Sequence, residues 1–526
     1  MKGPSTGYVP ESNGIGYAFY HRMLLNKHLT AQVDGISGVK DTYENLLDRC
    51  VQAAKRMKNL GIKSKDVISI CSANHLNSCV PMIAAYFIGA IPACLDPVFS
   101  LSDTVHLLKQ TTPKVIFVGD EATGLIEEAL FQSGLDIRIV VFGISDKYME
   151  FSSFLVDNGD DFAPIEVKNN REDAIILFSS GTTGMPKGIA LSHRGLLGGS
   201  NIFVYHGLSH KLTLVFSSYY WISSTLILVC SIMTGGARLI FPRFDPSSFW
   251  KLLQRFQVSL TFIAPSQAIA MYKHNCPNRL DNPFFADLLI GGGPMSDQYV
   301  RKIREMFPKT NCSIAYGQTE CSGVVVSFNR NDPKEMALMN LKPGSSGFIG
   351  PDFVCKVVDV ETREILGPNK KGELCFKSDY LMNGYQPAKS DDAWDSEGWL
   401  KSGDVGYYDE DGCFFVVDRI KEMLKYQSFH IPPSAIEAVI LTHPEVAHAV
   451  VIGLSHEDDG DHPLAVVSLK RKDNITEEDI IKYVEERMHD RYKLRGGVKF
   501  MDNIPSTASG KPRRNHLKLL VAQGQI

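Results

Sequence analysis

The sequence predicts an α/β protein with a large N-terminal domain of helix-covered sheets and a small α+β domain at its C-terminus. Its 526 residues exceed what one hydrophobic core usually supports, so at least two domains are expected. Helical and strand patterns alternate through most of the chain, as they do in parallel sheets covered by helices. Beyond Pro343 the pattern changes to short strands separated by glycine, proline and aspartate, which predicts a smaller, distorted β-barrel attached to the sheets.

The alternation begins with a helix from Thr42 to Leu60, where apolar residues recur at helical spacing and Gly61 ends the pattern. A strand follows at 67–71. Further helices are predicted at 105–110 and 122–133, and further strands at 115–118 and 137–142. This order is typical of strands joined by helices in a parallel sheet.

The centre of the chain repeats this alternation and adds glycine turns. A helix around 250–256 precedes strands at 260–265, 288–290 and 313–316. The second of these strands runs into Gly291-Gly292-Gly293, and the third runs into Gly317. Because sites in open α/β sheets lie beyond the carboxyl ends of the strands, both turns are expected to open onto one crevice.

The C-terminal unit follows Asp418, which we take as the boundary between domains of residues 1–418 and 419–526. The short barrel strands before it are predicted at 355–358, 372–376 and 412–417. The unit after it is predicted to contain helices at 434–442 and 477–488 and strands at 446–453 and 463–469.

The composition is that of an ordinary globular protein, with 44% hydrophobic and 22% charged residues. A formal net charge of −4 gives no reason to expect nucleic acid or an anionic membrane as a partner. Eleven cysteines without a Cys-x-x-Cys pair argue against a disulfide scaffold and a structural zinc site, and favour buried thiols in a reducing compartment. The longest apolar run, residues 79–95, is interrupted by Pro81, Gly89 and Pro92, which favours core over an integral membrane segment. The N-terminus lacks the apolar core of a signal peptide, so a cytoplasmic protein is expected.

A loop suited to polyphosphate follows the apolar strand at 175–178. It carries hydroxyls, glycines and a terminal cation, which are the groups that approach phosphate oxygens closely. It is not a Walker A loop, because Gly188 rather than serine or threonine follows Lys187. A surface loop between two strands is the alternative interpretation. The residues in question are Ser179, Ser180, Gly181, Thr182, Thr183, Gly184 and Lys187.

Residues 179–188, Ser-Ser-Gly-Thr-Thr-Gly-Met-Pro-Lys-Gly, are similar to the phosphate loop of the adenylate-forming superfamily. This superfamily holds acyl-CoA synthetases, peptide-synthetase adenylation domains and beetle luciferases. Four further motifs resemble those of the family and follow in its order, at 316–320, 398–407, 418–426 and 505–511, so the resemblance covers nearly the whole chain. It implies ATP and Mg²⁺ as cofactors, CoA as co-substrate, a small carboxylic acid as substrate, and a monomer or weak homodimer.

Three of these motifs contribute residues that the resemblance assigns to the nucleotide. Tyr316 stacks on adenine in such a site, Thr319 contacts the α-phosphate and Glu320 binds the magnesium, for which a hard carboxylate oxygen is suited. Asp404 would accept hydrogen bonds from the ribose hydroxyls, although a turn residue is the alternative for Ser-Gly-Asp alone. With Arg419 as a ribose or phosphate contact, the implied nucleotide site adds Gly292, Gly293, Tyr316, Gly317, Asp404 and Arg419 to the loop.

The last two motifs imply moving parts. Asp418 matches the family's hinge, about which the mobile small domain rotates between two half-reactions. Lys511 matches its catalytic lysine, which neutralises charge as a carboxylate attacks the α-phosphorus of ATP. Lys425 would lie close to the site in one domain orientation and is a residue that beetle luciferases also use. For the charged motif at 418–426, the alternative interpretation is a linker whose charged side chains are simply solvated.

The acyl pocket is expected among Tyr219, Tyr220, Trp221 and Ser224, with Gly292 and Gly317 beside them. Many relatives have a histidine in this stretch, and the chain has none there. Trp221 is the candidate gate for the acyl channel, and a core aromatic is an equally good interpretation. Apolar lining near it favours a fatty or aromatic acid over acetate.

At two further positions the chain differs from the family's pattern, and both differences concern the second half-reaction. Five residues beyond Arg194 the chain has Gly199 where beetle luciferases have an arginine near the luciferin, so a beetle-type luciferin site is disfavoured. Ser428 replaces a glycine that relatives place beside the pantetheine arm of CoA, and a side chain there is expected to narrow the CoA tunnel. The expected enzyme is an AMP-forming acyl-CoA synthetase. The alternatives are a luciferase, in which O₂ meets the adenylate, and an inactive relative that binds nucleotide or acyl chains. The C-terminus also lacks the Ser-Lys-Leu peroxisomal address of many luciferase-like relatives.

Overall fold

The computed structural model describes residues 1–155, 161–179, 186–208, 211–274, 282–386, 391–427, 429–471, 475–506 and 512–526. These residues form two compact units. The first unit consists of Met1–Gly292, Gln298–Cys355 and Phe376–Leu400, and the second consists of Gly293–Asp297, Lys356–Cys375 and Lys401–Ile526. The domain boundary at Asp418 stays a prediction.

An eight-stranded sheet of the first unit has the strand order β19-β9-β8-β4-β3-β5-β6-β7. Its strands are β3 (Val67–Cys71), β4 (Ile91–Leu95), β5 (Val115–Val118), β6 (Arg138–Val141), β7 (Met149–Glu150), β8 (Asp173–Ser179), β9 (Lys187–Ser192) and β19 (Gly384–Gln386). The strands from β8 to β7 are parallel, whereas β9 runs antiparallel to both β8 and β19. The apolar runs on either side of the predicted phosphate loop therefore form one strand pair.

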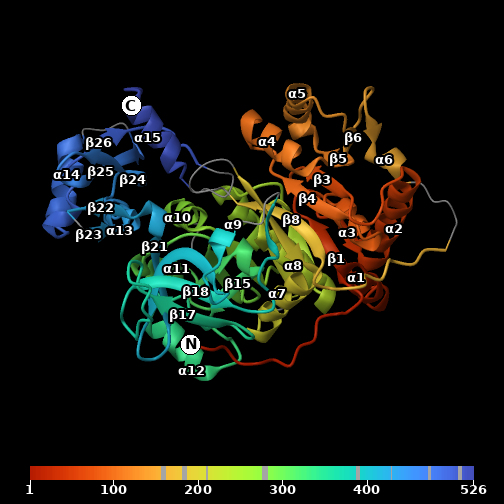
Figure 1. Cartoon of the computed structure of the whole chain (residues 1–526), viewed down its shortest axis with the longest axis horizontal. Coiled ribbons are helices and arrows are strands. Elements are labelled where there is room, and N and C mark those ends of the chain that lie inside the picture. Colours follow the sequence, from red (N-terminus) through yellow and green to blue (C-terminus); the bar gives the residue numbers. More distant parts are fainter. Residues whose placement is uncertain are drawn as a thin grey trace. The chain divides into compact units, whose positions relative to one another are not determined.

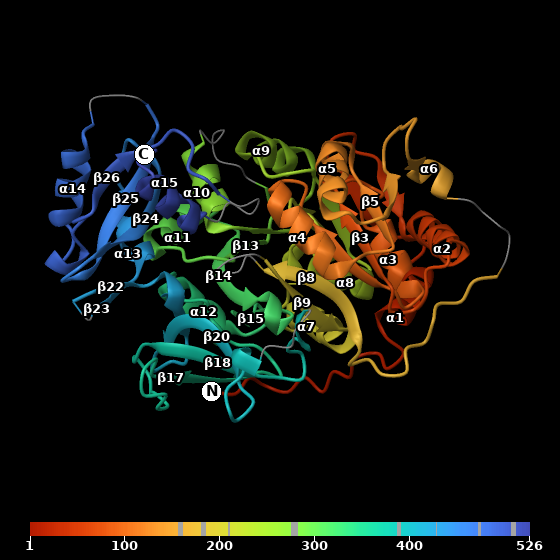
Figure 2. The same ribbon diagram turned by 45° about the horizontal axis from the view of Figure 1, so that its top comes forward.

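Helices cover both faces of this sheet, as Figures 1 and 2 show for the part drawn in red and orange. They are α1 (Ile15–Leu25), α2 (Tyr43–Asn59), α3 (Val80–Phe87), α4 (Leu101–Thr111), η1 (Asp120–Ala122), α5 (Thr123–Ser133) and α6 (Phe151–Phe154). Leu107 of α4 and Ile126 of α5 pack against Ile116 and Ile139 of the strands. Helix α2 begins where the sequence predicts, because the Thr42 side chain accepts a hydrogen bond from the Asn45 amide.

A nine-stranded sheet, also in the first unit, has the order β16-β15-β14-β13-β12-β10-β11-β1-β2. Its strands are β1 (Thr30–Asp34), β2 (Lys40–Thr42), β10 (Leu212–Val215), β11 (Ala237–Ile240), β12 (Leu260–Ile263), β13 (Asp287–Gly291), β14 (Asn311–Gln318), β15 (Gly323–Ser327) and β16 (Phe348–Ile349). The helices and short turns of this part are α7 (His193–Tyr205), α8 (Ile222–Thr234), α9 (Pro246–Arg255), α10 (Pro265–Lys273), α11 (Asp297–Met306), η2 (Thr319–Cys321), α12 (Pro333–Leu341) and η3 (Asp391–Ala393). Strands β13 and β14 are parallel neighbours, with Gly291 opposite Ala315. The predicted glycine turns therefore leave the sheet at the same edge.

A four-stranded sheet with the order β17-β18-β20-β21 occupies the region predicted as a distorted barrel. Its strands are β17 (Val354–Val358), β18 (Gly372–Lys377), β20 (Leu400–Tyr408) and β21 (Phe414–Arg419). Among the strands that the structure describes, this sheet does not close on itself. Most of its residues belong to the second unit.

The C-terminal part of the second unit contains a five-stranded sheet, ordered β23-β22-β25-β24 with β26 beside β25. Its elements are η4 (Ile420–Glu422), β22 (Leu424–Tyr426), β23 (Phe429–Ile431), α13 (Pro433–Ile440), β24 (Val446–His456), β25 (Gly460–Leu469), α14 (Glu477–Glu485), η5 (Asp490–Tyr492), β26 (Gly497–Phe500) and α15 (Arg514–Ala522). Helices α13 and α14 pack on one face, against Val451 and Val467, and α15 packs on the other, against Val450 and Val466. This is the α+β arrangement that the sequence predicts.

The hairpin of β24 and β25 is longer than predicted. Its paired residues continue from Gly453 and Pro463 to His456 and Gly460. The polar residues at the tip break the apolar alternation on which the prediction depended, while the backbone pairing goes on. The site that this extension creates is described below.

No helix among the described residues is both long enough and apolar enough to cross a membrane. The ten described cysteines are buried thiols, as the sequence predicts.

Arg514 at the start of α15 connects three elements of the second unit. Its guanidinium donates to Glu422 Oε2 at 2.7 Å, to Glu437 Oε1 at 2.6 Å and to the Val451 carbonyl at 3.2 Å. Both carboxylates are largely buried, and burial raises the pKa of Glu437 against the opposing effect of Arg514. Arg514 thus fixes the helix that follows residue 511.

Replacing Arg514 with alanine should lower the free energy of unfolding by about 3–5 kcal/mol, because it leaves a buried carboxylate without its cation. Urea unfolding followed by circular dichroism measures this loss. The exposed Lys518→Ala on the same helix is the control and should change stability by less than about 0.5 kcal/mol. Equal losses in the two variants would contradict the role given to Arg514.

Candidate functional site

The predicted phosphate loop connects β8 to β9, and Ser179 pairs with Lys187 at the open end of this strand pair. Residues 180–185 lie outside the described residues, so the positions predicted at Ser180, Gly181, Thr182, Thr183 and Gly184 stay predictions. Of Ser179 only the backbone is described. Lys187 is the exposed first residue of β9.

Lys187 and Glu320 are connected through Tyr385, a residue that the sequence did not indicate. The Lys187 ammonium lies over the Tyr385 ring, 5.4 Å from its centroid. The Tyr385 hydroxyl donates to Glu320 Oε1 at 3.0 Å. Strand pairing explains the meeting, because β19 places Tyr385 opposite Ile189 of β9. A cation and a carboxylate suited to a metal ion are thus held on two sides of one aromatic residue.

The turn that carries Thr319 and Glu320 is held by its neighbours. The Glu320 carbonyl accepts from the Met382 amide at 2.8 Å. Ser322 follows in the left-handed region, with φ of 54°, and its hydroxyl donates to the Tyr380 carbonyl at 2.6 Å. These contacts fix η2 against the segment that leads to β19, so the carboxylate position is set by the backbone.

Tyr316 and Gly317 lie at the end of β14. Tyr316 is buried, with its ring centroid 6.1 Å from that of Phe376. The ladder with β15 shifts its register between these two residues. A Cβ atom on Gly317 would lie 2.1 Å from the Gly323 carbonyl oxygen, so close backbone approach requires glycine here. Gly292, at the end of β13, has a φ of 87°, and Gly293 follows it.

Asp404 and Arg419 face each other across β20 and β21 in the second unit. They are paired in register, and Arg419 Nε lies 3.6 Å from Asp404 Oδ1. Asp404 is buried, and the side chain of Arg419 is more than a third exposed. The two residues that the resemblance assigns to ribose and phosphate are therefore adjacent.

Asp418, the predicted hinge residue, is buried and bonded to the helix that follows it. Its Oδ2 accepts from the Ser434 amide in the first turn of α13 at 3.2 Å, and the Ser434 hydroxyl donates to the Val417 carbonyl at 3.3 Å. A carboxylate at a helix N-terminus is favourable. Lys425 is exposed on β22, and its amide donates to Asp461 Oδ2 at 2.9 Å. Ser428 and Lys511 lie outside the described residues.

The predicted acyl-pocket segment is organised by Asp96, which the sequence did not indicate. Asp96 Oδ2 accepts from the Ser218 hydroxyl at 3.0 Å and from the Trp221 indole nitrogen at 3.3 Å. Burial raises the pKa of Asp96, although these donors and the Val98 amide oppose the shift. Sequence reasoning missed this residue because a single aspartate at the end of β4 has no motif around it.

The aromatic residues of that segment have different surroundings. Tyr219 is buried and its hydroxyl accepts a hydrogen bond from Arg238. Tyr220 packs edge-on against Phe99 at 4.9 Å and Trp221 at 4.8 Å, within the core cluster of the eight-stranded sheet. Ser224, in α8, is 2% exposed. Trp221 is only partly buried, which makes it the most accessible of the four predicted pocket residues.

Helix α7 approaches the η2 turn closely at Gly199. A Cβ atom there would lie 2.3 Å from the Ser322 carbonyl oxygen, which is backbone and has little freedom to move. With this backbone, no larger side chain fits at the position where beetle luciferases have an arginine.

Comparison with known proteins identifies relatives along nearly the whole chain. Residues 24–386 match the family model "AMP-binding enzyme" and residues 435–511 match "AMP-binding enzyme C-terminal domain". The luciferin 4-monooxygenase of Photinus pyralis is 30% identical over 97% of this chain and 95% of its own. The 4-coumarate–CoA ligase 2 of Nicotiana tabacum is 30% identical over 92% of this chain and 90% of its own. The luciferase-like enzyme of the nonluminescent mealworm Zophobas morio has a similar structure, with a TM-score of 0.76, 34% identity, and coverage of 80% of this chain and 99% of that one.

Substitution of Asp96 tests the organisation of the pocket segment. Asp96→Ala removes the acceptor of one buried and one part-buried donor and should destabilise the protein by about 1–3 kcal/mol. Asp96→Asn keeps a carbonyl acceptor in the same place and should cost less. Urea unfolding at one pH ranks the variants, and an asparagine variant as unstable as the alanine variant would contradict the hydrogen-bond argument.

The raised pKa of Asp96 also predicts a pH dependence. A carboxyl with a raised pKa in the folded state stabilises that state below its ordinary pKa of 3.8, and this contribution is lost as the pH rises through the folded-state pKa. The asparagine side chain of the Asp96→Asn variant is neutral at every pH, so this variant does not lose stability in the same way as the pH rises. Its stability relative to the wild type should therefore increase as the pH rises above about 4 and through the raised folded-state pKa of Asp96, as unfolding midpoints at several pH values would measure. A constant difference would show that Asp96 has no raised pKa.

Proposed function

The chain belongs to the AMP-binding enzyme family, and on this premise we propose that it activates a carboxylic acid with ATP and then transfers the acyl group to CoA. The observation that carries the proposal is the connection of Lys187, Tyr385 and Glu320, which brings the lysine of the phosphate-loop motif to the carboxylate of the second motif. In the first half-reaction the substrate carboxylate attacks the α-phosphorus and pyrophosphate leaves. In the second, the CoA thiol displaces AMP.

The roles proposed for the individual residues follow the family's motifs. The Lys187 ammonium would contact phosphate oxygens, and the loop before it would bind the departing pyrophosphate. Tyr316 would stack on adenine, and Thr319 would contact the α-phosphate. In the second unit, Asp404 and Arg419 would hold the ribose, an assignment supported by their pairing across β20 and β21.

Glu320 fits a magnesium ion because its carboxylate oxygens are hard ligands and its orientation is fixed by the Tyr385 hydroxyl. When bound, Mg²⁺ supplies positive charge that offsets the charge on the phosphates. Glu320 would hold the ion, Tyr385 would orient Glu320, and Lys187 would add a second cationic contact beside it.

The acid is proposed to be aromatic or fatty. The segment from Tyr219 to Trp221 offers aromatic rings rather than charged groups, and Trp221 is the accessible one. The indole nitrogen is hydrogen-bonded to Asp96, so movement of Trp221 as a gate would break one hydrogen bond. The curated relatives include 4-coumarate–CoA ligases, whose named substrate is an aromatic acid.

A luciferase is the second candidate, and the relatives named luciferin 4-monooxygenase favour it. The close contact of Gly199 with the Ser322 carbonyl argues against a luciferin site of the beetle type. Both candidates share the adenylation step, and they differ in whether CoA or O₂ consumes the adenylate.

A panel of carboxylic acids with ATP, Mg²⁺ and CoA tests the proposal, with pyrophosphate and thioester measured separately. Release of both products with an aromatic or fatty acid is expected. Pyrophosphate without thioester would overturn the CoA step, and light with a candidate luciferin would then favour the luciferase. If no acid in the panel gave pyrophosphate, the remaining interpretation would be an inactive relative that binds nucleotide or acyl chains.

Two substitutions separate metal binding from the Lys187 contact. Glu320→Gln should lower the rate of adenylation by about 10²-fold to 10³-fold, because it removes the charge that holds the metal. Tyr385→Phe keeps the ring under Lys187 but removes the hydrogen bond to Glu320. It should raise the half-saturating Mg²⁺ concentration by roughly 10-fold to 100-fold. Pyrophosphate release at varied Mg²⁺ measures both, and an unchanged Mg²⁺ requirement in Tyr385→Phe would contradict the positioning role.

Lys511→Ala should slow adenylation by about 10²-fold to 10³-fold while leaving thioester formation from supplied acyl-adenylate nearly unchanged. The reason is that the cation is needed only while charge develops at the α-phosphate. Lys518→Ala provides a matched control of a nearby exposed lysine. If Lys511→Ala impairs the two half-reactions equally, its assignment to adenylation is wrong.

A further inference from the structure

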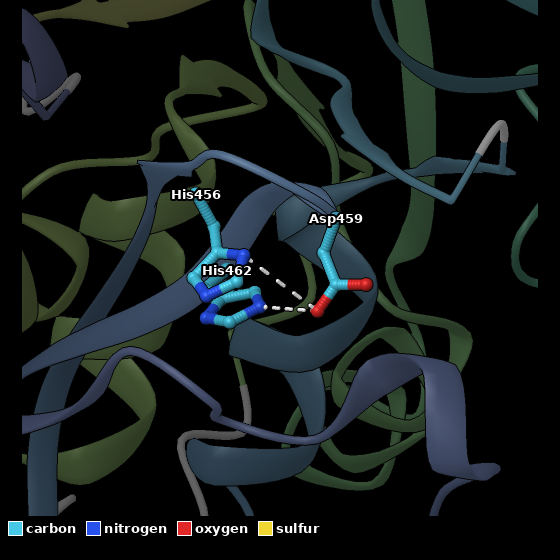
Figure 3. Close-up of side chains that lie close together, drawn as sticks. All are labelled: His456, Asp459 and His462. Atoms are coloured by element: carbon cyan, nitrogen blue, oxygen red, sulfur yellow. Dashed lines mark hydrogen bonds and ion pairs between the residues drawn. The ribbon is translucent and has the colours of Figure 1, made fainter.

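The tip of the β24–β25 hairpin brings together three side chains that the proposed function does not use. They are His456 at the end of β24, Asp459 in the turn and His462 on β25. Figure 3 shows both imidazole rings directed at the same carboxylate oxygen. His462 Nε2 lies 2.9 Å from Asp459 Oδ2 and His456 Nδ1 lies 3.8 Å from it. One nitrogen of each histidine and one oxygen of the aspartate all lie within 4.8 Å of one another.

The pairing of the two strands of the hairpin places the His456 and His462 side chains close together. His456 pairs with Gly460 and Leu454 pairs with His462, so the two histidines are diagonal neighbours on one face of the sheet. Their rings are stacked, with centroids 4.0 Å apart and planes 19° apart. Gly460 has a φ of 88°, and the glycine lets the chain turn back so that Asp459 faces the rings.

The aspartate is held from its other side. The Gln427 side-chain Nε2 donates to Asp459 Oδ1 at 2.7 Å. The Gln427 backbone amide donates to the Asp459 backbone carbonyl at 2.8 Å. One carboxylate oxygen is thereby occupied while the other faces the histidines. A ligand carboxylate oriented by an outer hydrogen bond is the usual arrangement around protein-bound metals.

The distances and the donor types suit a zinc-type ion. A tetrahedral zinc ion with bonds of about 2.0–2.1 Å holds its ligand atoms roughly 3.3 Å apart. The two nitrogen–oxygen distances of 2.9 Å and 3.8 Å lie on either side of this spacing, and the ligand atoms that are up to 4.8 Å apart would move closer together on binding. Two imidazole nitrogens with one carboxylate oxygen favour zinc and its neighbours over magnesium and calcium, which prefer oxygen alone. Residues 456–462 read His-Glu-Asp-Asp-Gly-Asp-His, with four carboxylates and no lysine or arginine to repel a cation.

We propose that His456, Asp459 and His462 form a binding site for one divalent transition-metal ion, with Zn²⁺ as the preferred occupant. The ion cross-links the two ends of the hairpin tip. Through Gln427 it also secures the chain that follows β22, whose Tyr426 pairs with Gly460. Three protein ligands leave a fourth position open, and His456, whose side chain is 44% exposed, places that position at the solvent. The site is independent of the proposed acid activation.

Titration of the full-length protein, without a histidine tag and without nucleotide, tests the site. Isothermal titration calorimetry with ZnCl₂ should show one tight ion for each chain, and Co²⁺ should give the visible absorption bands of a site with nitrogen ligands. Zn²⁺ should also raise the melting temperature, because an ion that binds only the folded state stabilises it. Mg²⁺ at the same concentration should do neither.

Matched variants locate the bound ion. His456→Ala combined with His462→Ala should abolish the tight site, whereas His516→Ala, an exposed histidine on α15, should keep it. Glu320→Gln should also keep it, which separates this site from the proposed magnesium site. Gln427→Ala should weaken Zn²⁺ binding by roughly 10-fold to 100-fold as a positioning residue.

Folding and binding are distinguished by measuring each variant in a chelator. Circular dichroism and the melting temperature without metal should match those of the wild type, so that lost binding reflects lost ligands. Absence of stoichiometric Zn²⁺ uptake by the wild type would overturn the proposal. Equal uptake by the double histidine variant would overturn it as well, since the ion would then be bound elsewhere.

Discussion

The pairing of β9 with β8 on one side and with β19 on the other is the constraint on which the candidate site depends. Antiparallel pairing with β8 returns the chain from the phosphate-loop motif at a fixed place, opposite Ser179. Pairing with β19 brings Tyr385 from almost two hundred residues downstream into contact with Lys187 and Glu320. Without β19, Tyr385 would not connect the phosphate-loop motif to the motif that carries Glu320. A sheet register, which is a property of the backbone, therefore determines the distance between the cation and the carboxylate.

The parts of this protein that could be predicted from sequence are those with local signals. Helix α2 has a capping threonine and a clear apolar stripe, and the parallel strands are short apolar runs between helices. The family motifs carry their own order of residues, and the family is confirmed along the chain. Tyr385 and Asp96 could not be found in this way. Each acts on a partner far away in the sequence, and only the strand order of the sheets brings the partners together.

The hairpin tip illustrates a different limit. Its apolar alternation stops near Gly453, and the prediction stopped there too, whereas the backbone ladder continues to His456. The histidines and the aspartate are spaced three residues apart, a signal that could have been noticed. The chain has no Cys-x-x-Cys pair, and this absence argues against a structural zinc site built on cysteines but not against one built on histidines. The ladder turns the same spacing into a common face, because paired residues of a hairpin point to the same side.

The contact of Gly199 with the Ser322 carbonyl links two parts of the molecule that differ in chemistry. Helix α7 can lie against the η2 turn only while position 199 has no side chain, and the same turn carries Glu320. The identity of residue 199 is thus coupled to the placement of the carboxylate. An evolutionary or engineered path toward an arginine at this position is epistatic: the η2 turn has to move first, and any such movement also shifts Glu320.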